Sequence, residues 1–73
     1  MNIYYEILGL SRNASKNDIK NAFRKKIKEN HPDRFNEPFK KELAEEKTRD
    51  IIEAYKILLD EFKGKNYYNN NQN

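Results

Sequence analysis

The residues of this chain that could do chemistry are few, and they meet in the tripeptide His31-Pro32-Asp33. His31 is the only histidine and there is no cysteine, so the common zinc-binding donor sets are missing. A nucleophile needs a base within hydrogen-bond reach, and the sequence offers no such pair. Gly9 and Gly64 each stand alone, so no phosphate-binding glycine loop is present. We therefore predict a protein that is not an enzyme and that needs no metal or cofactor.

The tripeptide is better suited to be a preformed binding turn. Proline fixes its own φ, and an aspartate either caps backbone amides or offers a carboxylate to a cation. The tripeptide follows the most basic segment of the chain, residues 16–30, which holds six positive and two negative side chains. Lys20, Arg24 and Lys28 are four residues apart, so on a helix they form one ridge. Such a ridge favours an acidic partner, although a solvated helix face explains the charge equally well.

Length and composition limit the rest of the molecule. A chain of 73 residues forms one small domain, and its 36% hydrophobic content predicts a thin core. No apolar run approaches the ~18 residues of a membrane span, and no signal-peptide core follows Met1. The lack of cysteine fits a reducing compartment. We expect a cytoplasmic monomer without membrane or nucleic-acid partners.

Two helices are predicted to precede the tripeptide. A short helix occupies the first ten residues, with Asn2 as its N-cap and Gly9 in the left-handed position at its end. Ser15 and Asp18 have the spacing of a capping box for a second helix over residues 16–29. This helix ends at the tripeptide, because proline disfavours a helical conformation in the residue before it.

A third and longest helix is predicted from about residue 38 to residue 60, with a break at Gly64. Its apolar stripe weakens over residues 44–51, which we expect to project past the body of the domain. The domain spans residues 1–63, and residues 64–73 form a polar, Asn-rich tail or linker that is predicted to be disordered. The chain is thus an all-α antiparallel hairpin of two long helices, with a short N-terminal helix packed on it. Its predicted structural core comprises Tyr5, Leu8, Leu10, Ile19, Ala22, Ile27, Ile51, Ala54, Tyr55 and Leu58.

Four blocks of the sequence coincide in order and spacing with one known family. They are Tyr4-Tyr5-Glu6-Ile7-Leu8-Gly9-Leu10, then Ile19, Ala22 and Phe23 with their basic neighbours, then His31-Pro32-Asp33-Arg34, then Glu53-Ala54-Tyr55 with Leu58 and Asp60. Over residues 2–62 the chain resembles the J-domain of DnaJ-like (heat shock protein 40 type) co-chaperones. The resemblance implies that fold, with a fourth helix that is short, frayed or absent.

The resemblance implies a module that docks on a heat shock protein 70 (DnaK-type) chaperone in its ATP-bound state. Docking stimulates ATP hydrolysis by the chaperone and couples it to client binding in protein folding and the stress response. Client proteins are expected to bind regions outside this chain. In the family, the His-Pro-Asp loop and the basic helix before it make the contact. The partner-binding residues implied here are His31, Pro32, Asp33, Arg34, Lys20, Phe23, Arg24, Lys25 and Lys28.

Three residues depart from the pattern of the family. Lys26 stands where the second helix usually has leucine, and Asn30 stands where a large aromatic residue precedes the loop. Thr48 stands where the third helix often has phenylalanine. These departures bear on the packing between the helices and on affinity for the partner.

Two other functions remain open from the sequence. The basic helix could lie along nucleic-acid phosphates, and such binding would fall steeply with salt and would not depend on Asp33. Alternatively, the chain could be a J-like tethering scaffold that binds the chaperone without stimulating it. The intact His31-Pro32-Asp33 argues against the scaffold.

Overall fold

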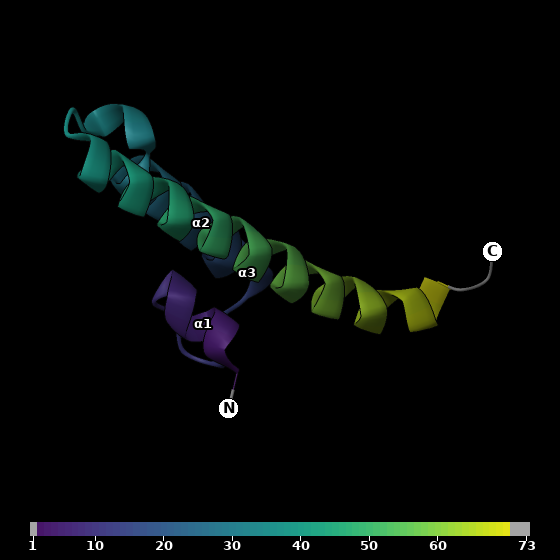
Figure 1. Cartoon of the computed structure of the whole chain (residues 1–73). Helices are drawn as coiled ribbons and strands as arrows, with labels where there is room; N and C mark the ends of the chain where they lie inside the picture. Colours follow the sequence, from purple (N-terminus) through teal and green to yellow (C-terminus); the bar gives the residue numbers. More distant parts are fainter. Residues whose placement is uncertain (1, 71–73) are drawn as a thin grey trace.

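The part of the chain that the structure describes is built from helices alone. The computed structural model describes the backbone of residues 2–70 and the side chains of residues 2–63. Its elements are α1 (Ile3–Leu8), α2 (Lys16–Asn30), a single 3-10 turn η1 (Pro32–Arg34) and α3 (Pro38–Asn70). Helices α2 and α3 lie side by side as an antiparallel pair, and α1 packs on both (Figure 1). This confirms the predicted J-domain-like hairpin, and residues 2–70 contain no strand and no separate fourth helix.

Helix α1 begins and ends at the two residues that the sequence predicts. The Asn2 side chain accepts a hydrogen bond from the amide of Tyr4 at 2.9 Å. Gly9 takes the left-handed conformation, with φ of 74°, and its amide donates to the carbonyl of Glu6. A residue with a side chain is strained at such a φ, which explains why glycine ends a helix that must turn sharply toward α2.

Helix α2 is held at its start by the predicted capping box. The amide of Asp18 donates to Ser15 Oγ at 3.0 Å, and the amide of Ser15 donates to Asp18 Oδ2 at 3.0 Å. The helix ends at Asn30, one residue later than predicted. His31 is extended, with φ of −63° and ψ of 130°, as expected for a residue that precedes proline.

Helix α3 is longer than predicted, because Gly64 does not end it. Its backbone stays helical from Pro38 to Asn70, so the expected end near residue 60 and the break at Gly64 are wrong. A glycine inside a helix destabilises it by about 1 kcal/mol relative to alanine. The helical hydrogen bonds of the turns before and after Gly64 outweigh this cost, and no proline follows to end the helix. The predicted disorder of residues 71–73 lies outside the described residues, and the domain boundary at residue 63 stays a prediction.

Residues 44–51 pack against α2, which corrects the expectation that they project. Ala44 and Ile51 are each 3% exposed, and Thr48 Oγ1 between them donates to the carbonyl of Asn30 at 3.2 Å. Ala44 is small and Thr48 is polar, so the inward side of this segment does not stand out as a stripe of large apolar residues in the sequence. The C-terminal end of α3 extends past α1 and α2 instead (Figure 1). The 51 Å long axis of the molecule matches the ~50 Å expected for the 33 residues of α3.

The core lies where the three helices meet. Its fully buried members are Leu8, Ile19, Ile51, Ala54 and Leu58. The other five predicted core residues are partly buried and pack against these: Tyr5, Leu10, Ala22, Ile27 and Tyr55. Burial of a leucine or isoleucine side chain contributes about 1.5–3 kcal/mol, so a core with this few fully buried side chains is thin.

Candidate functional site

The tripeptide forms a turn that its own histidine caps. The amide of Asp33 donates to His31 Nδ1 at 3.1 Å, and the amide of Arg34 donates to the carbonyl of His31 at 3.0 Å. Two acceptors of one residue, Nδ1 and the main-chain carbonyl of His31, thus bind two successive amides of the turn. The loop is therefore ordered before any partner arrives.

The Asp33 carboxylate is presented to solvent. Its side chain is 83% exposed, and its nearest charged or chargeable neighbour is His31 Nδ1, 3.8 Å from Oδ2. Nδ1 accepts the main-chain amide of Asp33, and no lysine or arginine among residues 2–63 lies within 4.0 Å of the carboxylate. Asp33 is thus free to accept hydrogen bonds from a cation on another molecule.

Arg34 folds back onto the helix that precedes the loop. Its guanidinium Nη1 donates to the carbonyls of Lys28 and Glu29, each at 3.3 Å. The last carbonyls of a helix have no partner within it, so this guanidinium satisfies two of them and places a positive charge at the negative end of α2. Arg34 therefore supports the loop from inside the domain, and its predicted contact with a partner stays a prediction.

The basic side chains of α2 form no ion pair with the other side chains of residues 2–63. Arg24, Lys25 and Lys28 are exposed and Lys20 is half-buried. Among the side chains of residues 2–63, the two pairs within 4.0 Å are His31 with Asp33 and Lys40 with Glu37. No lysine of α2 takes part in either. Lys20, Arg24 and Lys28 thus form a positive ridge without ion pairs among the described residues, and this ridge ends near the loop.

A concave depression of about 620 Å³ joins the loop to this basic surface. It gathers five of the nine predicted partner-binding residues along with Glu29, and is lined by Lys25, Lys28, Glu29, His31, Asp33 and Arg34. Lys20 and Arg24 lie farther toward the start of α2, and Pro32 is half-buried in the turn. Sequence reasoning missed Glu29, although its place four residues after Lys25 is a signal that could have identified it.

Phe23 serves the packing of the helices in this structure. Its ring stacks on Tyr55 of α3, with centroids 3.9 Å apart and planes 13° from parallel. The contact joins two of the blocks that carry the resemblance, and it fixes α2 against α3. A direct contact of Phe23 with a partner stays a prediction.

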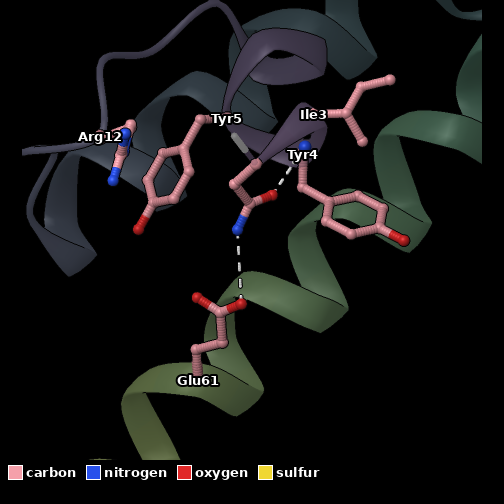
Figure 2. Close-up of a pocket in the computed structure, with 6 residues that line it drawn as sticks. Ile3, Tyr4, Tyr5, Arg12 and Glu61 are labelled. Atoms are coloured by element: carbon pink, nitrogen blue, oxygen red, sulfur yellow. Dashed lines mark hydrogen bonds between the residues drawn. The ribbon is translucent and has the colours of Figure 1, made fainter.

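A second hollow lies far from the loop, between α1 and the later part of α3. It has a volume of about 550 Å³ and is lined by Asn2, Ile3, Tyr4, Tyr5, Arg12 and Glu61. Asn2 Nδ2 donates to Glu61 Oε2 at 3.4 Å, which joins α1 to α3. In Figure 2 the Glu61 side chain points from α3 toward α1, from which Tyr4 and Tyr5 extend. Glu61 is 23 residues beyond Pro38, or about 35 Å along the helix. None of the predicted partner-binding residues lines this hollow.

The described residues contain neither a metal-binding cluster nor a membrane-spanning helix. No group of three or more histidine, aspartate or glutamate side chains there is arranged to hold a metal ion. No described helix is long and apolar enough to cross a membrane.

Comparison with known proteins gives one consistent answer. The family model described as DnaJ domain matches residues 3–68. A chaperone protein DnaJ of Thermosipho melanesiensis is 56% identical over 57 residues, covering 78% of this chain and 15% of that protein. Those of Staphylococcus carnosus and Mycoplasma genitalium are 53% and 52% identical, each covering 88% of this chain, and 16% and 17% of their own lengths. The chain thus corresponds to a small part of these relatives. No solved structure matches.

Proposed function

We propose, because this chain belongs to the DnaJ domain family, that it is a co-chaperone module that docks on a heat shock protein 70 (DnaK-type) chaperone and stimulates its ATP hydrolysis. The relatives that support the proposal carry the name chaperone protein DnaJ. The chain spans only 15–17% of their length. We therefore assign docking and stimulation to this chain, and client binding to regions outside it.

One observation carries the proposal: the Asp33 carboxylate is exposed on an ordered turn, beside basic side chains of α2 that form no ion pairs within the described residues. A surface that fits this site must offer a cation to Asp33 and acidic groups to the ridge of Lys20, Arg24 and Lys28. A hydrogen bond between an arginine and a carboxylate is strong and specific in geometry. The ridge contributes mainly to the rate of encounter. Proline fixes the turn in advance, which lowers the ordering cost on binding.

The chain needs no catalytic group to stimulate hydrolysis. A ligand that binds one state of its partner more tightly shifts the partner toward that state, in proportion to the difference in affinity. We infer that the loop and α2 bind the ATP-bound chaperone and stabilise its hydrolysis-competent conformation. The ATP chemistry then belongs wholly to the chaperone.

Titration of the isotope-labelled chain with a hydrolysis-deficient DnaK-type chaperone tests where and when docking occurs. With ATP bound, we expect amide signals of residues 20–35 to change, and we expect weaker binding when ADP is bound. Asp33→Asn keeps the shape of the side chain and removes its charge, so affinity should fall about tenfold or more. Asp60→Asn makes the same change at an exposed site on α3 and should leave affinity unchanged.

Two outcomes would reject this site. In one, the affected signals cluster around the hollow of Figure 2 instead of the loop. In the other, Asp33→Asn and Asp60→Asn bind equally well. Salt-sensitive binding of duplex DNA that is indifferent to Asp33→Asn would favour a nucleic-acid function instead.

A further inference from the structure

We propose that Thr48 is a positioning residue for the docking loop: its hydroxyl ties the last turn of α2 to α3 and so sets the direction in which His31-Pro32-Asp33 leaves the helix. The role of Thr48 in docking rests on the proposed function, whereas its contact with Asn30 is a feature of the structure alone.

The tether begins at the last residue of α2. Thr48 Oγ1 donates to the main-chain carbonyl of Asn30 at 3.2 Å, across 18 residues of sequence, and the bond is partly buried. The Asn30 side chain is held separately, since its Nδ2 donates back to the carbonyl of Lys26 at 2.9 Å. Threonine on a helix often bonds to a carbonyl of the preceding turn instead. Here it bridges two helices.

The α3 side of the tether is firmly held. Ala44 and Ile51, one turn before and one turn after Thr48, are each 3% exposed. The hydroxyl therefore projects from a fixed part of α3 toward α2. A hydrogen bond from a fixed donor restrains the orientation of the peptide that accepts it.

The accepting peptide is the one that leads into the loop. Asn30 is followed directly by His31, whose carbonyl accepts the amide of Arg34 and whose Nδ1 accepts the amide of Asp33. Pro32 has a fixed φ, so the turn behaves as one ordered unit. Its direction relative to α2 is set at the Asn30–His31 junction. Thr48 restrains that junction from α3, while Arg34 holds the carbonyls of Lys28 and Glu29 from the loop.

Both ends of the tether are places where this chain departs from the pattern of the family, Asn30 before the loop and Thr48 on the third helix. Sequence reasoning treats the two departures separately, because nothing in their spacing indicates that they touch.

The test compares Thr48→Val, which keeps the shape and removes the hydroxyl, with Thr48→Ser, which keeps the hydroxyl. We expect hydrogen exchange of the Arg34 and Phe35 amides to quicken about three- to tenfold in Thr48→Val, the range expected for the loss of one such bond. Thr48→Ser should restore exchange close to the parent, and Thr48→Ala should match Thr48→Val. Ile51→Val is the control, since it weakens the α3 core without touching the tether.

A second measurement separates positioning from direct contact with the partner. If the loop adopts its binding-competent direction less often, a higher concentration of this chain is needed to occupy the chaperone, but the full stimulation is regained at saturation. In Thr48→Val the concentration for half-maximal stimulation of the chaperone's ATPase should rise about threefold with the maximal rate unchanged, as expected for one lost hydrogen bond.

The proposal is overturned if the hydrogen-exchange rates of the Arg34 and Phe35 amides in Thr48→Val equal those of the parent chain. It is also overturned if Ile51→Val raises these rates as much as Thr48→Val does. It also fails if Thr48→Ser behaves like Thr48→Val, or if Thr48→Val lowers the maximal rate alone. If the parent chain does not stimulate any chaperone, the proposed function fails. The exchange rates would then still decide the structural assignment of Thr48.

Discussion

At the scale of single residues, Arg34 combines two interactions that substitutions can separate. Its guanidinium bridges the carbonyls of Lys28 and Glu29, and its charge also borders the loop depression. Arg34→Lys keeps the charge but replaces a planar fork by a hydrated point charge. We expect it to lower the free energy of unfolding by up to about 1 kcal/mol, measured by urea denaturation. Arg49→Lys, on an exposed part of α3, should change nothing. Unchanged stability in Arg34→Lys would show that the bridge does not support α2.

Lys26 is the residue whose type fits its surroundings least. It is half-buried on the inward side of α2, and its Cε lies 3.6 Å from the position that a Cβ on Gly9 would occupy. No carboxylate among the described side chains lies within 4.0 Å of its ammonium group. Lys26→Leu should therefore stabilise the domain by about 1 kcal/mol, which raises Tm by about 4–8 °C. The exposed Lys56→Leu is the control. A lower Tm in Lys26→Leu would mean that the lysine stem already fills its site well.

At the scale of elements, the course of α3 through Gly64 is the clearest point to test. Inside a helix, alanine is more stable than glycine by about 1 kcal/mol. At a left-handed helix end, alanine is the worse residue. Because the backbone is helical on both sides of Gly64, Gly64→Ala should raise both the helical circular dichroism signal and Tm. A fall in either would place the end of α3 at Gly64 instead.

What the sequence could and could not predict follows from the range of each interaction. The caps at Asn2, Gly9 and Ser15 were predictable, because each depends on groups within a few residues of one another. Gly64 was misjudged, because a weak local preference was overcome by the helix around it. The contact of Thr48 with Asn30 was not predictable, since it joins residues 18 apart through tertiary packing. The place of the loop was predictable, but what holds it was not.

At the scale of the whole molecule, charge divides along the hairpin. Residues 16–30 carry six positive and two negative groups, whereas residues 37–60 carry five positive and seven negative. The positive side runs along α2 and reaches the loop at one end of the hairpin, and the hollow of Figure 2 lies toward the other end. A partner that docks at the loop is thus drawn to one face of the domain by its acidic groups.

This polarity predicts how docking responds to salt. Raising the ionic strength from about 0.05 M to about 0.3 M shortens the screening length about 2.4-fold, from ~14 Å to ~6 Å. The association rate, measured by stopped flow, should fall several-fold, with a smaller change in dissociation. Lys28→Gln should reduce this dependence on salt, and Lys56→Gln should not. An association rate that does not respond to salt would exclude a role for the ridge in encounter.

Single-turnover ATP hydrolysis by a DnaK-type chaperone tests the central claim most directly. The rate is measured with the parent chain, with Asp33→Asn and with Asp60→Asn, after circular dichroism confirms that all three are folded. We predict that the parent and Asp60→Asn stimulate hydrolysis equally and that Asp33→Asn does not stimulate it, because the carboxylate on the ordered loop makes the decisive contact. Equal stimulation by the parent and Asp33→Asn, or binding of the parent without stimulation, would contradict the account.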